Sequence, residues 1–146
     1  MSSIHNLWHA IKSRVCHNHG VSLLDFNNGN LEGNRARNRT AQLFVLEMIL
    51  YKHRLQYATI FQPLDGKDAL HHLILTKTKW KLADIRSLSL EDCLFVIQDE
   101  LRLSRVPEEA KHLLNAANLP EAAFIFEELP EEDWAPKENS TFLASM

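Results

Sequence analysis

Residues 41–51 read AQLFVLEMILY, and residues 43–51 are the longest apolar stretch of the chain, interrupted only by Glu47. On a helix extended to about residue 57, these apolar side chains would cover almost every side. A helix that is apolar all round is a buried one. We therefore predict a central core helix over about residues 40–57.

The N-terminal half holds two further helical patterns. Residues 3–17 place apolar side chains at helical spacing, with Ser2 or Ser3 available as an N-cap. After Pro63, Asp65 is placed to cap a second helix that ends near Thr78. The first of the two reads as an amphipathic helix.

The C-terminal half shows helix-starting signals at regular intervals. A short helical turn is expected within residues 80–88, and Ser89 with Asp92 resembles a capping box at the start of the next helix. Prolines favour the first position of a helix, which predicts two more short helices, at 107–118 and 120–130. About six helices and no convincing period-two strand indicate an all-α, single-domain bundle.

Three segments depart from this helical pattern. Residues 27–38 are rich in Asn and Gly and are expected to form a flexible loop. Residues 57–62 have the composition of a strand, so a short β element there is the main alternative to an entirely helical chain. Residues 131–146 read as a flexible acidic and polar tail after a helical domain of residues 1–130, unless a partner or Trp134 docks them.

Composition places the chain among ordinary globular proteins. With 146 residues, 45% hydrophobic and 24% charged, it is long enough to bury one core. Cys16 and Cys93 stand alone, which excludes a disulfide framework and a four-cysteine zinc site. No segment approaches the roughly 20 apolar residues of a membrane span, and the N-terminus lacks the features of a secretory signal. We expect a cytoplasmic protein without a cofactor and without a membrane partner.

The net charge of −3 hides an uneven distribution along the chain. Residues 1–90 contain twelve Lys/Arg and six Asp/Glu, a net of +6, whereas residues 91–146 contain four and thirteen, a net of −9. Each half is therefore expected to attract groups of opposite charge, and these include the other half of the chain.

Catalytic and metal-binding chemistry has weak candidates. His5 and His9 lie at i and i+4 and could present two metal ligands, but a site would need ligands from elsewhere. Glu47 is the one carboxylate in the most apolar helix, where burial could raise its pKa toward that of a general base. Tyr51 and Arg54 follow on the same face and offer a purely structural role for it.

Two basic clusters suit contact with phosphates. They are Arg35, Arg37 and Arg39 on the expected loop, and Lys77, Lys79 and Lys81 around Trp80. Lysines and arginines at this density are also ordinary surface residues, and the sequence pI of about 6.2 is not that of a typical nucleic-acid binder.

The acidic half has its own candidate for binding a basic protein surface. It consists of Glu127, Glu128, Glu131, Glu132, Asp133 and Trp134. The same segment could instead fold back over the basic clusters of its own chain and mask them.

The leading hypothesis is a small, non-enzymatic accessory or regulatory protein that binds another macromolecule, most directly a protein. The alternative is a nucleic-acid-binding module that uses the two basic clusters. A metal-dependent or hydrolytic enzyme around Glu47 and the histidines has the least support. A homodimer through the first helix is a further option, because Trp8 and Ile11 suit an interface as well as a core.

Overall fold

A computed structural model describes residues 3–144 and 146. Over these residues the chain forms seven α-helices and two 3-10 turns with no strand, which confirms the predicted all-α fold. The elements are α1 (Ser3–His19), α2 (Leu31–Tyr57), α3 (Lys67–Thr78), α4 (Leu82–Arg86), α5 (Leu90–Val96), η1 (Leu103–Arg105), α6 (Glu108–Ala116), η2 (Glu131–Asp133) and α7 (Pro136–Leu143).

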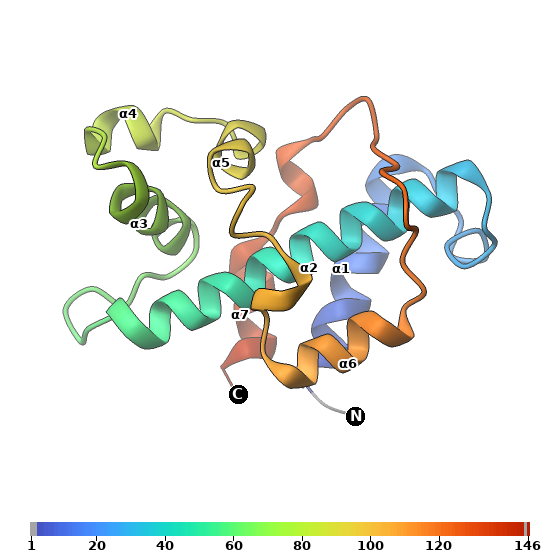
Figure 1. Ribbon diagram of the computed structural model, residues 1–146, viewed down its shortest axis with the longest axis horizontal. Coiled ribbons are helices and arrows are strands. Elements are labelled where there is room, and N and C mark those ends of the chain that lie inside the picture. Colours follow the sequence, from blue (N-terminus) through green and yellow to red (C-terminus); the bar gives the residue numbers. More distant parts are fainter. Residues whose placement is uncertain (1–2, 145) are drawn as a thin grey trace.

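Helix α2 is the central element, as the apolar run predicts. It crosses the molecule from end to end, with α1, α6 and α7 around one part of it and α3, α4 and α5 grouped toward the other end (Figure 1). Every residue from Leu43 to Leu50 is buried, including Glu47. Full burial follows from a helix that is apolar on all sides.

Helix α2 begins well before the predicted start, so the flexible loop expected over residues 27–38 is wrong beyond Asn30. Asn30 caps the helix, because its side-chain oxygen accepts a hydrogen bond from the Gly33 amide at 2.7 Å. Gly33 is buried against the preceding turn, where an added Cβ would lie 2.0 Å from the Asp25 carbonyl oxygen. Asn and Gly here start a helix and allow close packing.

The predicted N-terminal helix is confirmed and extends to His19. It packs on α2 and α7, and its buried apolar side chains include Ile4, Leu7, Ile11 and Val15. The Trp8 ring meets Phe44 of α2 edge to face, with the ring centroids 5.4 Å apart. Trp8 and Ile11 are buried here, so packing within one chain accounts for the apolar face of α1.

Helices α3 to α5 form a second group beside the C-terminal part of α2. The end of α3 at Thr78 matches the prediction, but Asp65 does not cap it; Gly66 holds the cap position at φ +58° without a side-chain hydrogen bond. At α5 the predicted cap is confirmed, since the Ser89 hydroxyl accepts a hydrogen bond from the Asp92 amide at 3.1 Å.

Helix α6 follows Pro107 as predicted, whereas residues 120–130 are not helical. Burial alternates in this connection, with Phe126 buried and Ile125 and Glu127 exposed on either side. The Phe126 ring stacks on His19 at a centroid distance of 3.7 Å. An extended path lets this ring reach α1, which outweighs the helix-starting tendency of Pro120.

The β element considered for residues 57–62 is absent from the described chain, where residues 59–62 form a tight turn. The segment after residue 130, expected to be a flexible tail unless a partner or Trp134 docks it, is ordered over its described part. Residues 131–143 form η2 and α7 and pack against α1 and α2, with Trp134, Asn139 and Leu143 buried. Trp134 docks the segment, the condition under which order was expected.

No helix in the described ranges combines the length and apolarity that crossing a membrane requires.

Candidate functional site

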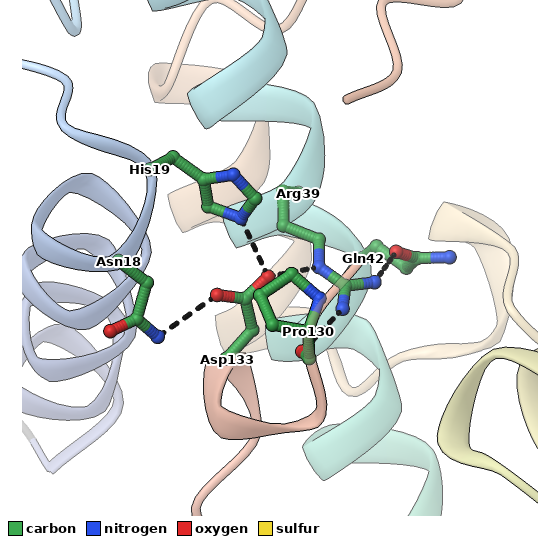
Figure 2. A network of polar contacts seen from close by, with 6 residues as sticks. All are labelled: Asn18, His19, Arg39, Gln42, Pro130 and Asp133. Carbon is green, nitrogen blue, oxygen red and sulfur yellow. Dashed lines mark hydrogen bonds and ion pairs between the residues drawn. The ribbon is translucent and has the colours of Figure 1, made fainter. Parts of the chain in front are cut away.

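The carboxylate of Asp133 is the centre of a buried polar cluster. Arg39 Nε donates a 2.8 Å hydrogen bond to Asp133 Oδ2, and His19 Nε2 lies 2.8 Å from the same oxygen. Asn18 Nδ2 donates to Oδ1 at 3.0 Å. Figure 2 shows the three side chains converging on the carboxylate from α1 and α2. We call these four residues the Asp133 cluster.

Burying the Asp133–Arg39 ion pair carries a cost in desolvation free energy. The side chain of Asp133 is 0% exposed and that of Arg39 is 2% exposed. Arg39 uses its remaining donors on Gln42 Oε1 at 2.8 Å and on the Pro130 carbonyl at 3.4 Å, also drawn in Figure 2. Removing two charges from water is costly unless each is paired and hydrogen-bonded, a condition that this arrangement meets.

A second buried group of polar side chains lies where α7 meets α2. Glu47 is 2% exposed, and the N–H donors of Trp134 and Asn139 face it. Within the described residues, Glu47 Oε2, Trp134 Nε1 and Asn139 Nδ2 all stop short of hydrogen-bond geometry. We call these three residues the Glu47 cluster.

Burial raises the pKa of Glu47 to about 6. The Asn139 and Trp134 side chains and the positive charges of Arg54 and Arg14 oppose this shift without cancelling it. Arg14 also donates to Asn139 Oδ1 at 3.1 Å and pairs with Glu138 at 2.9 Å, which ties α7 to α1. The carboxyl is therefore poised between charged and neutral forms near pH 6, at a cavity of about 300 Å³ that Glu47 lines together with Tyr51 and Arg54.

The structure divides the predicted acidic protein-binding residues into two groups. Glu127, Glu128 and Glu132 are exposed. Glu131 accepts a 2.8 Å hydrogen bond from the Leu90 amide, which joins η2 to the start of α5. Asp133 and Trp134 face the interior of this chain.

The first basic cluster is turned inward. Arg35 pairs with Glu32 on the surface of α2 at 2.8 Å. Arg37 is buried and donates to the Asn118 carbonyl at 2.7 Å and to Asn34. Because Arg39 belongs to the Asp133 cluster, two of the three arginines hold the fold together.

The second basic cluster lies largely on the protein surface. Lys77 pairs with Asp99 at 2.5 Å, and its charge is matched by Glu100 nearby. Lys79, Trp80 and Lys81 are exposed at the connection between α3 and α4. Of the two basic clusters, these are the side chains that are exposed to solvent and have no acidic partner among the described residues.

The histidines do not assemble into a metal site. His5 and His9 are exposed on α1, and the described residues include no group of three or more metal-type ligands. One pair was not foreseen: His53 Nε2 lies 2.8 Å from His72 Nδ1. Burial, with the nearby positive charges of His72 and Arg54, lowers the pKa of His53 to about 4. Their 19-residue separation gave no sequence signal for this contact.

Sequence reasoning also missed a displayed pair of apolar side chains. Ile60 is 91% exposed and Phe61 is 83% exposed, in the loop that projects beyond the end of α2 (Figure 1). Their strand-like composition suggested a β element, although it equally suits a turn that presents apolar groups to solvent.

Comparison with family models, curated proteins and solved structures found no match to this chain.

Replacing Asp133 with Ala should lower the free energy of unfolding by about 3–5 kcal/mol, because it leaves Arg39 buried without a counter-charge. Urea unfolding followed by circular dichroism measures this. Glu138→Ala is the matched control: Glu138 pairs with Arg14 but is 74% exposed, and its loss should cost less than about 1 kcal/mol. The double variant R39M/D133L should recover much of the stability that D133A loses. Equal, small losses in D133A and E138A would contradict the assigned role of the cluster.

Replacing Glu47 with Gln should stabilise the protein at neutral pH. The folded pKa lies above the ordinary value of 4.5, so the native state holds the proton more tightly, and Glu47 makes stability fall as pH rises from about 4.5 to about 6. At pH 7.5 the E47Q protein should be more stable by about 2 kcal/mol, with the difference vanishing near pH 4.5. His53, whose lowered pKa makes stability fall as the pH drops below 6.5, is common to both proteins and cancels in the difference. A less stable E47Q protein at pH 7.5 would show that the carboxylate is fully satisfied.

Proposed function

We propose that this chain is a non-enzymatic protein-binding module that engages its partner through the 59–62 turn. The observation that carries the proposal is the exposure of Ile60 and Phe61, neighbouring large apolar side chains that are 91% and 83% open to solvent. Aromatic and aliphatic side chains of this kind supply most of the binding energy when they enter a partner's pocket. Leu55 and Tyr57, at the end of α2, are also exposed and extend the apolar surface.

Hydrogen bonds hold the turn in one shape before any partner arrives. The Thr59 amide donates to the Gln62 carbonyl at 2.9 Å, and the Gln62 amide donates back to the Thr59 carbonyl at 3.2 Å. The Thr59 hydroxyl accepts from the amides of Phe61 and Gln62 at 3.3 and 3.0 Å. A loop that is already ordered loses little conformational entropy on binding, which favours affinity.

The charges near the turn favour a protein over a bilayer as the partner. Within residues 52–68, Lys52, Arg54 and Lys67 stand against Asp65 and Asp68, an excess of one positive charge, and the Lys52 ammonium donates to the Arg105 carbonyl. Segments that insert apolar side chains into anionic membranes usually carry a larger excess of basic residues beside them. An uncharged apolar pocket on another protein suits this nearly balanced surface.

The nucleic-acid alternative now rests on fewer residues. Arg37 and Arg39 are committed to internal contacts, Arg35 and Lys77 have acidic partners, and Lys79, Trp80 and Lys81 remain. Affinity for nucleic acid scales with the number of phosphates that cations neutralise, so two lysines support weak binding at most. The enzyme hypothesis keeps one observation in its favour, because Glu47 lines a cavity of about 300 Å³ together with Tyr51, Arg54 and Asp65. Among the described residues, no hydrogen bond joins Glu47 to another titratable side chain of that cavity.

The proposal is tested by placing a photo-crosslinking phenylalanine analogue at position 61 in native cells. The matched control carries it at Phe95, a phenylalanine of α5 that is 72% exposed and distant from the turn in sequence. We expect a discrete adduct from position 61 that position 95 does not give. The partner protein captured in this adduct, once purified, should bind the unmodified chain. Its affinity for the I60A/F61A variant should be lower by about 30-fold or more.

Two results would contradict the proposal. One is unchanged affinity of the purified protein for I60A/F61A, since the turn would then not be an anchor. The other is an adduct of position 61 with a second copy of this chain alone, together with a dimer in sedimentation analysis that I60A/F61A abolishes. That outcome would make the turn a self-association surface.

A further inference from the structure

A cavity of about 600 Å³ lies between α3, the connection from α4 to α5, and η2. It is lined by the basic side chains Lys67 and Arg86 with His71 and by the acidic side chains Glu131 and Glu132. The apolar part of the lining consists of Leu70, Leu88, Leu90, Cys93 and Trp134. Cavities of this size hold small molecules, with a few polar groups that orient them on an apolar base. We call this cavity the polar cleft.

The cations of the polar cleft are unpaired. Among the described residues, neither Lys67 nor Arg86 forms an ion pair or a hydrogen bond through its side chain. Both side chains are exposed, as are the unpaired Lys79 and Lys81, but Lys67 and Arg86 differ from those lysines in lining the same cavity. Two unpaired cations that line one cavity form an arrangement that an anion would stabilise.

The electrostatics of His71 show that these groups act on one another. Its pKa is lowered first by burial and further by the positive charges of Arg86 and Lys67, while Asp68 opposes the shift. The Cys93 thiol below is kept neutral by burial and by Asp92 and Glu131, which raise its pKa to about 11. An anion placed beside His71 would offset the repulsion among His71, Arg86 and Lys67, whereas the buried thiol stays neutral.

The remaining polar groups indicate what the rest of the ligand needs. The Ser89 hydroxyl accepts from the Asp92 amide, which leaves its own proton available to donate. Glu131 uses Oε1 on the Leu90 amide, and Glu132 is exposed, so carboxylate oxygens are available to accept. A ligand that satisfies the charges of both signs in the cleft therefore carries an anionic group and a donor, best a cation.

We propose that the polar cleft binds a small phosphorylated molecule that also bears an amino group. Lys67 and Arg86 bind the phosphate, with His71 and the Ser89 hydroxyl as additional donors, and Glu131 and Glu132 receive the amine. This site shares no residue with the 59–62 turn, so it stands or falls separately from the protein-binding function proposed above.

The experiment is a titration of the full chain with three probes: inorganic phosphate, phosphoserine and serine. Binding is followed by proton NMR of the His71 ring, assigned with the H71Q variant. Phosphate and phosphoserine should both move the His71 resonance and raise the pKa of His71, because each places negative charge beside the ring. Phosphoserine should bind more tightly than phosphate, and serine should not bind.

Matched charge variants separate the cleft from the general surface. K67Q/R86Q should weaken phosphoserine binding by ~10-fold or more, since both phosphate-binding cations are lost. K79Q/K81Q removes the same charge from exposed lysines outside the cleft and should bind like the unmodified chain.

An unmoved His71 resonance, or equal weakening in the two double variants, would overturn the site. Equal affinity for phosphate and phosphoserine would overturn the assignment of Glu131 and Glu132 to an amine.

Discussion

A buried carboxylate near the C-terminus organises this fold. Asp133 is joined to Arg39 across 94 residues of sequence and to Asn18 and His19 of α1, with no exposure of its side chain to water. An ion pair this deep is retained only when both charges keep their hydrogen bonds, so α1, α2 and η2 must meet in one arrangement. The stacking of Phe126 on His19 and the burial of Trp134 on α2 follow from that placement.

The same arrangement explains where the uneven charge of the sequence goes. The acidic C-terminal segment lies over part of the basic N-terminal half, and Asp133 and Glu138 pair with Arg39 and Arg14. Many of the charges that favoured binding to nucleic acid or to a basic protein are therefore used within the chain. What remains at the surface includes the apolar 59–62 turn, the two lysines beside Trp80, the cations of the polar cleft, and Glu127, Glu128 and Glu132 of the acidic segment.

Local patterns in the sequence predicted local structure well. The apolar run around Leu46 identified the buried central helix, and the spacing of Ser89 and Asp92 identified a cap that the structure contains. The early start of α2 was missed because Asn30 and Gly33 carry the composition of a loop, although one caps the helix and the other permits close packing. Composition describes which conformations a residue tolerates, and it does not say which of them the rest of the fold selects.

Local sequence patterns did not predict the interactions between residues that are far apart in the sequence. Nothing near Asp133 indicates that its partner is Arg39, and the segment read as a tail because its acidic character is visible while its contacts with α1 and α2 are not. Trp134 was the one local sign that the segment could dock. The cleft cations Lys67 and Arg86 likewise come together only when α3 packs beside the connection between α4 and α5.

Native-state hydrogen exchange tests the central claim, that residues 131–143 are an integral part of the fold. It compares the amides of Asn139 in α7 and Leu46 in α2 over a series of low denaturant concentrations. The account predicts that Asn139 exchanges with an opening free energy within about 2 kcal/mol of that of Leu46, because opening α7 breaks the contacts that hold α1 and α2 together. An opening free energy near zero at Asn139, with Leu46 still protected, would contradict it and make the segment a loosely attached tail.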